Sequence, residues 1–201
     1  MNDRRLNITE DGKIEGQVIG KPIRRINLYG GPCSGKSTLA SYIFAKLKMQ
    51  NRSVELISEY IKFWTYIPRT PKGYDSFYCQ SKHVHKEDTV LRSGTDLIVS
   101  DSPILLAYFY AYYYDSPAQD AMLSIHREFE KEYPSINIVL EREDKFYEQH
   151  GRYENLEQSK EIDNVLKNVV IKHTNDFEFF SCLDQDKIFD YIISRINNVK
   201  S

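Results

Sequence analysis

Short apolar segments alternate along the chain with longer stretches in which apolar residues recur every three or four positions. The short runs predict buried strands, and the three-to-four spacing predicts amphipathic helices. Strands that are apolar on both sides are typical of parallel sheets covered by helices. We therefore expect an α/β fold with a five-stranded, mostly parallel sheet in three α/β/α layers. The expected strands are 25–29, 53–58, 96–101, 136–140 and 177–182, and the expected helices are 37–49, 74–92, 104–114, 118–133, 157–173 and 186–199.

The stretch between the first strand and the first helix, GGPCSGKST, fits the phosphate-loop pattern G-x-x-x-x-G-K-[ST]. Glycines let the backbone turn N–H groups toward a phosphate, the lysine reaches the outer phosphates, and the serine hydroxyl can ligate Mg²⁺. The alternative is a chance glycine-rich turn, but strand, loop and helix are the context that the motif requires. The chain is expected to have a P-loop NTPase or kinase fold and to bind ATP through Gly30, Gly31, Cys33, Ser34, Gly35, Lys36, Ser37 and Thr38.

Two carboxylates follow predicted strands, Glu59 after the second and Asp101 after the third. Ligands of open parallel sheets bind at the carboxyl ends of the strands, so both should lie near the phosphate loop. We expect Glu59 to be catalytic or to orient an acceptor hydroxyl, and Asp101 to hold Mg²⁺ together with Ser37, directly or through water. The alternatives are a solvated strand end for Glu59 and a helix N-cap for Asp101.

Two further segments should lie near this edge. Residues 141–156 are charged and lack an apolar face, which indicates either a surface loop or a lid that brings Arg142 and Arg152 onto the transferring phosphoryl group. Residues 61–73 are aromatic and turn-rich, and predict a loop or a broken helix near the pocket. The aromatic run 108–114 could stack a base, although a packed wall is favoured.

Composition narrows the class of protein. The 201 residues suit one globular domain, with a polar extension at 1–24 and the kinase domain at 25–201. A net charge of -2 gives no global basic field for nucleic acid, and the three dispersed cysteines indicate reduced thiols. No apolar run approaches the roughly 20 residues that cross a bilayer, so we expect a cytoplasmic protein. We expect it to be a monomer or a homodimer. A local basic strip for DNA could still form from Arg69, Lys72, Lys82, Lys86 and Arg92.

Glu59 to Trp64 resembles the Glu-x4-Trp segment of deoxyribonucleoside kinases. The resemblance implies that Glu59 is the base on the acceptor hydroxyl and that Trp64 lines the nucleoside pocket. It also implies that Gln80 hydrogen-bonds the base. The Asp/Glu-Arg-Ser segment of that family corresponds to Asp101-Ser102, which lacks the arginine.

From residue 26 onward the chain also resembles small phage-encoded P-loop proteins, in the loop opening 27–38, Glu-Tyr-x-Lys at 59–62, Asp-Ser-Pro at 101–103 and Gly-Arg at 151–152. Some relatives phosphorylate 5-hydroxymethyluracil in phage DNA. This resemblance implies a phage-encoded enzyme of DNA modification that acts in the host cytoplasm.

The function expected from the sequence is an ATP- and Mg²⁺-dependent kinase. Its acceptor would be a hydroxyl of a nucleoside, a nucleotide or a hydroxymethylated pyrimidine, with DNA left open. The alternatives are a nicotinamide-riboside-type kinase and a non-catalytic ATP-dependent switch or binding module. The five histidines lack the spaced partners of a zinc site.

Overall fold

The computed structural model describes residues 21–67, 69–143, 147–148 and 153–197. Of the predicted extension at 1–24, residues 1–20 lie outside the described part. The next residues already contact the domain, because Lys21 forms an ion pair with Glu132 and the N–H of Arg24 donates to the carbonyl of Pro134. The division into an extension and a kinase domain stays a prediction.

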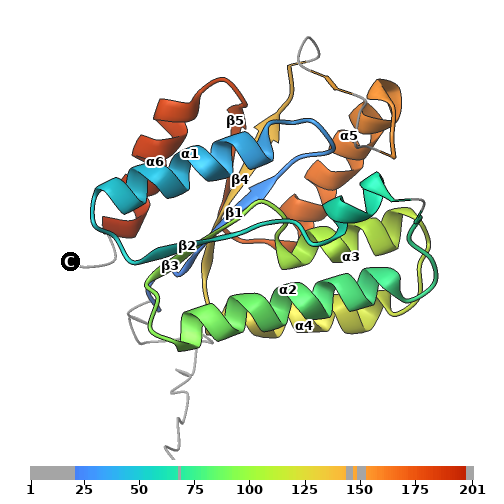
Figure 1. Cartoon of the computed structure of the whole chain (residues 1–201), viewed down its shortest axis with the longest axis horizontal. Coiled ribbons are helices and arrows are strands. Elements are labelled where there is room, and N and C mark those ends of the chain that lie inside the picture. Colours follow the sequence, from blue (N-terminus) through green and yellow to red (C-terminus); the bar gives the residue numbers. More distant parts are fainter. Residues whose placement is uncertain (1–20, 68, 144–146, 149–152, 198–201) are drawn as a thin grey trace, which may run out of the picture.

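All neighbouring strands of the five-stranded sheet run parallel, in the order β2-β3-β1-β4-β5 (Figure 1). The predicted parallel sheet is therefore confirmed. The phosphate loop follows β1, the central strand. The strands are β1 (Arg25–Tyr29), β2 (Val54–Ile57), β3 (Leu97–Ser100), β4 (Ser135–Glu141) and β5 (Phe177–Ser181).

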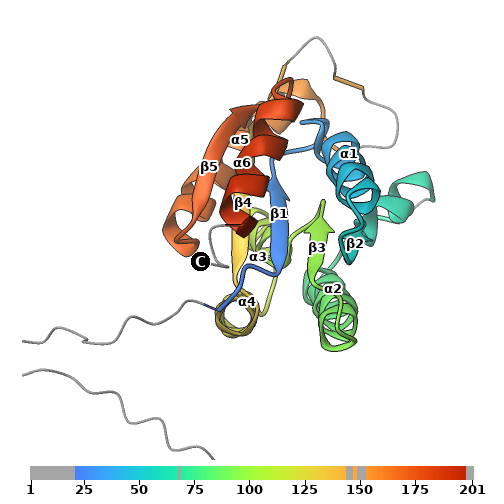
Figure 2. The ribbon, with the colours of Figure 1, turned by 90° about the vertical axis from the view of Figure 1, so that its left-hand side faces the viewer.

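Helices cover both faces of the sheet (Figures 1 and 2). On one face, α1 and α6 bury their apolar side chains against Ile26 and Leu28 of β1. On the other face, α3, α4 and α5 pack with Tyr29, because successive side chains of a strand point to opposite sides. The three-layer prediction is confirmed. The helices are α1 (Lys36–Met49), α2 (Asp75–Arg92), α3 (Ile104–Tyr113), α4 (Gln119–Glu132), α5 (Leu156–His173) and α6 (Gln185–Asn197).

The aromatic segment after β2 forms a short 3₁₀ helix, η1 (Ile61–Tyr66). This agrees with the predicted broken helix. The aromatic side chains of η1 differ in exposure, since Trp64 is buried whereas Phe63 is exposed. The segment lies beside the carboxyl end of β2 and therefore forms one wall of the cavity described below.

Two charged side chains, Arg25 and Glu87, are fully buried next to the sheet. Arg25 of β1 donates from Nε to Glu87 of α2, at 2.9 Å, and from Nη1 to Glu130 of α4, at 3.0 Å. Burial raises the pKa of Glu87, while the nearby Arg25 guanidinium opposes that shift. These two ion pairs join β1, α2 and α4, and removing Arg25 would leave the carboxylate of Glu87 uncompensated in the interior.

Candidate active site

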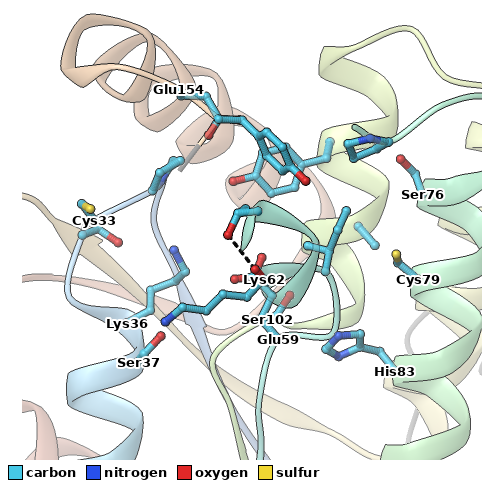
Figure 3. Close-up of a pocket in the computed structure, with 18 of the residues that line it drawn as sticks. Cys33, Lys36, Ser37, Glu59, Lys62, Ser76, Cys79, His83, Ser102 and Glu154 are labelled. Carbon is cyan, nitrogen blue, oxygen red and sulfur yellow. Dashed lines mark hydrogen bonds between the residues drawn. The ribbon is translucent and has the colours of Figure 1, made fainter. Parts of the chain in front are cut away.

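A cavity of about 190 Å³ opens at the carboxyl edge of the sheet. Figure 3 shows the phosphate loop and the start of α1 on one side, α2 on the opposite side, and η1 between them. The end of α3 and the segment before α5 complete the wall, through Tyr110, Tyr114, Tyr153 and Glu154. The phosphate loop thus faces a polar, aromatic chamber.

The phosphate loop has the backbone that its glycines permit. Gly30 has φ 150° and Gly35 has φ 86°, in the region that residues with a Cβ rarely adopt. A Cβ at Gly30 would lie 2.4 Å from Oγ of Ser34. Lys36 donates from Nζ to the carbonyls of Gly30, at 2.6 Å, and Gly31, at 2.9 Å. The ammonium is therefore held at the mouth of the loop, which is where outer phosphates would bind. Of the predicted ATP-binding residues, those from Cys33 to Thr38 line the cavity.

The back of the loop is fixed by an ion pair that the sequence analysis did not anticipate. Asp163 of α5 accepts a hydrogen bond from the N–H of Gly31 at 2.6 Å, and its other oxygen accepts from Nε of Arg142. Nη2 of Arg142 donates to the carbonyl of Pro32 at 2.8 Å. A capping box at Asn155 begins α5 and so helps to position this carboxylate. The loop is thereby joined to both β4 and α5.

Arg142 was expected to lie in a lid over the phosphoryl group. The structure places it directly after β4 and behind the loop, with its side chain only 7% exposed and engaged by Asp163. A contact between Arg142 and the transferring group stays a prediction. Arg152 and part of the predicted lid lie outside the described residues.

The two predicted carboxylates follow β2 and β3, on neighbouring strands of the sheet. Glu59 lines the cavity between the loop and α2 (Figure 3). Asp101 is buried, and its Oδ1 has no hydrogen-bond partner among the described residues. The capping alternative for Asp101 is wrong, because α3 has Pro103 at its N-cap and no side-chain capping bond.

The side chains of Ser37 and Asp101 carry oxygens, the ligand type that Mg²⁺ prefers. The ion prefers oxygen ligands and retains several waters. Ser37 lines the cavity with a hydroxyl. Asp101 carries a buried carboxylate oxygen without a described partner, but it is not among the residues that line this cavity. In the part of the chain that the structure describes, no group of three or more histidine, cysteine or acidic side chains is arranged for a metal. A joint Mg²⁺ site of Ser37 and Asp101, completed by phosphate and water, stays a prediction.

Trp64 and Gln80, which the resemblance assigned to the nucleoside, do not line the cavity with the phosphate loop. Trp64 is buried beneath the guanidinium of Arg69, which lies 3.4 Å from the ring centroid. The amide nitrogen of Gln80 is engaged within the fold, because Nε2 donates to the carbonyls of Ile104 and Met122 at 3.2 and 3.0 Å. Its Oε1 is buried without a hydrogen-bond partner among the described residues. Contacts of both residues with substrate stay predictions.

Two tyrosines at the end of α3, Tyr110 and Tyr114, line the phosphate-loop cavity, which Trp64 and Gln80 do not line. Tyr110 and Tyr114 stand one helical turn apart with parallel rings, and the hydroxyl of Tyr114 donates to Glu154 at 2.8 Å. Burial raises the pKa of Tyr110, and the carboxylates of Glu59 and Glu154 add to the shift. Tyr110 thus stays protonated and can donate to a ligand. The aromatic run was expected to be a packed wall, yet its i, i+4 spacing puts two rings on the cavity side while Phe109 enters the core.

Two groups from α2 line the cavity but are poor candidates for acid–base chemistry. Burial lowers the pKa of His83 to about 4, and its Nε2 accepts from the N–H of Tyr60 at 3.1 Å. The neutral ring therefore fixes the backbone next to Glu59. Burial raises the pKa of the Cys79 thiol to about 12, so this cysteine is not a nucleophile near neutral pH.

A second cavity, of about 350 Å³, adjoins the first and shares Glu59 and His83 with it. Apart from Ser58, its other lining residues are aromatic or basic, and they lie in the segment from Tyr60 through η1 and on α2. Of the predicted basic strip, Lys82 and Lys86 line this cavity. Arg69 pairs with Asp75 and Arg92 pairs with Asp88. The lining is Ser58, Glu59, Tyr60, Phe63, Trp64, Lys82, His83 and Lys86.

Comparison with known proteins places this site in a family. Residues 25–181 match the model of the family described as "AAA domain". No curated protein matches the sequence. Among solved structures, the YorR protein from Bacillus subtilis, in complex with phosphorylated GDP, is similar with a TM-score of 0.59 and 17% identity, over 86% of this chain and 95% of that chain. This similarity concerns the fold. None of the helices in the described ranges is both long and apolar enough to cross a membrane.

Proposed function

The chain belongs to the AAA domain family, and we propose that it is a kinase which transfers the terminal phosphate of ATP to an alcohol on a nucleoside, a nucleotide or a hydroxymethylated pyrimidine. The observation that carries the proposal is the shared cavity. The phosphate loop and Glu59 line the same chamber, which extends away from the loop toward two tyrosines and Glu154 (Figure 3). A protein that only hydrolyses or senses ATP needs no such second compartment.

The proposed reaction assigns a role to each group around the cavity. The loop N–H groups and Lys36 bind the triphosphate, and Glu59 accepts the proton of the acceptor hydroxyl. The hydroxyl oxygen forms a bond to the terminal phosphorus as the bond between that phosphorus and the bridging oxygen breaks. The electron pair of the broken bond leaves with ADP. Mg²⁺ held by Ser37 and Asp101 would neutralise charge on the phosphates.

The chamber beyond Glu59 supports a planar, polar acceptor. Tyr110, Tyr114 and Tyr153 offer ring faces and hydroxyls, and Glu154 offers a carboxylate that can accept from a base or a sugar. Ser76 adds a hydroxyl from α2. Nucleosides present both a flat ring and several donors, so they suit this lining better than a purely apolar alcohol does.

An acceptor within DNA is supported by the second cavity. An alcohol at Glu59 on one base would leave the neighbouring nucleotide next to Lys82 and Lys86, which can bind its phosphate, and next to Phe63, whose ring is 70% exposed. Resemblance to kinases of 5-hydroxymethyluracil in phage DNA makes that base the first polymer acceptor to test. The single tryptophan, Trp64, lines this cavity, so its fluorescence should report a bound strand directly.

The test is an acceptor panel with ATP and Mg²⁺, read by mass spectrometry. It contains thymidine, thymidylate, 5-hydroxymethyldeoxyuridine, an oligonucleotide with that base, and nicotinamide riboside. Guanine nucleotides are included because the YorR structure holds one. A phosphomonoester on a nucleoside-type acceptor supports the proposal, and one on nicotinamide riboside alone favours the alternative kinase. ATP hydrolysis that no acceptor diverts would reject a kinase. A partner bound in only one nucleotide state would then favour a switch.

A further inference from the structure

Lys62 lies in the candidate site, and neither the motif nor the resemblance gives it a role. It belongs to η1, where Oγ1 of Thr65 donates to the Lys62 carbonyl at 2.7 Å and closes the turn. It lines the same cavity as Lys36 and Ser37. Figure 3 shows its side chain extending from the η1 wall toward the phosphate loop. The ammonium group therefore approaches the triphosphate site from the acceptor side.

The ammonium group of Lys62 has no ion-pair partner within the described residues. The side chain is half-buried, yet within the described ranges no carboxylate pairs with its ammonium group and no acceptor hydrogen-bonds to it. The other cations around the loop are engaged, Lys36 by loop carbonyls and Arg142 by Asp163. A partly desolvated ammonium with three unused donors is stabilised when an anion binds beside it.

The chemistry of the cavity indicates which anion that is. Phosphoryl transfer spreads negative charge over the three outer oxygens of the moving group, and cations placed around it stabilise the transition state. Lys36 approaches from the loop side. A second cation on the acceptor side would add to this stabilisation, and Lys62 extends toward the loop from that side (Figure 3).

We propose that Lys62 binds the terminal phosphate of the nucleotide and remains on that phosphoryl group while it moves to the acceptor. The inference rests on the proposed kinase function. Lys62 takes no part in the proton transfer, because Glu59 takes the proton of the alcohol and ADP takes the electron pair of the broken bond. In this arrangement the base, Glu59, lies in the segment between β2 and η1, and the cation, Lys62, lies in the first turn of η1.

The experiment compares Lys62→Ala, Lys62→Gln and Lys62→Arg with the wild type, with Lys131→Ala as a control. Lys131 is an exposed lysine of α4 that pairs with Glu128. Titration calorimetry measures binding of Mg-ADP and of a non-hydrolysable β,γ-imido analogue of ATP. Removing a charged contact to the terminal phosphate should weaken the analogue about 10-fold and leave ADP within about twofold. Turnover with an acceptor should fall by about 10²–10³, with partial recovery in Lys62→Arg.

The binding measurement does not depend on a known acceptor, so the two proposals can fail separately. Wild-type protein that phosphorylates nothing would reject the kinase function, while the ratio of analogue to ADP affinity would still test Lys62. Equal weakening of both nucleotides would overturn the Lys62 proposal. Unchanged affinities, together with a shift only in the pH dependence of turnover, would also overturn it, because Lys62 would then act on Glu59. Lys62→Gln, which keeps most of the side-chain length, tests the same outcomes if the alanine variant fails to fold.

Discussion

Replacing Asp163 by alanine should both destabilise the fold and disturb the phosphate loop. Arg142 and Asp163 have side chains that are only 7% and 12% exposed, so the pair is nearly removed from water. Without the carboxylate, the guanidinium is left without its charge partner. Breaking a buried pair in this way costs about 3–5 kcal/mol of unfolding free energy. For a chain of about 200 residues this corresponds to a fall in Tm of about 10 °C.

The double-mutant cycle separates this electrostatic cost from simple loss of packing. Asp163→Ala, Arg142→Met and the double variant are compared with wild type by urea denaturation at one pH and salt concentration. Because the double variant contains no unpaired charge, it should be more stable than the sum of the single losses by about 2 kcal/mol. Loss of the Asp163 bond to Gly31 should also weaken ATP binding about 10-fold. Additive losses with unchanged ATP affinity would refute the reasoning.

Three further results are expected. Lys36→Ala should abolish ATP binding in calorimetry, whereas Glu59→Gln should spare binding and lower turnover by about 10²–10⁴; retained turnover would remove Glu59 from the chemistry. Stability should fall on acidification, because the pKa of buried His83 is about 4 when folded against 6.5 when unfolded. Its contribution is present above pH 6.5 and is lost toward pH 4, with about 2 kcal/mol gone by pH 5. Urea denaturation at pH 7 and 5 tests this, and His83→Gln should lose less stability between the two. An oligonucleotide should quench Trp64 fluorescence in a salt-sensitive way that Lys82→Ala/Lys86→Ala reduces; an unchanged signal would contradict a DNA acceptor.

The fold and the loop were readable from sequence because their signals are local. The phosphate-loop motif, Gly30 to Ser37, is one contiguous stretch, and a short apolar run predicts each strand. The rule that ligands bind at the carboxyl ends of parallel strands then brought Glu59 and Asp101 to the same edge as the loop. That rule needs no knowledge of how helices pack.

The rest of the site depends on packing between distant elements. Asp163 reaches the loop only because α5 covers the sheet beside β1, and Glu154 meets Tyr114 across a gap of 40 residues. Gln80 matched the resemblance by position, yet two carbonyls from α3 and α4 take its amide. Helical spacing alone could have placed Tyr110 and Tyr114 on one face of α3, but it does not say which face meets the cavity.

The most direct test is a single-turnover reaction with ATP that carries a radiolabel in its terminal phosphate. Protein and labelled ATP are mixed first, and acceptor is added together with excess unlabelled ATP. If the triphosphate and the alcohol meet in one cavity, the bound label should appear on the acceptor hydroxyl in the wild type and not in Glu59→Gln. Label found only in inorganic phosphate, whichever acceptor is supplied, would contradict the proposed transfer.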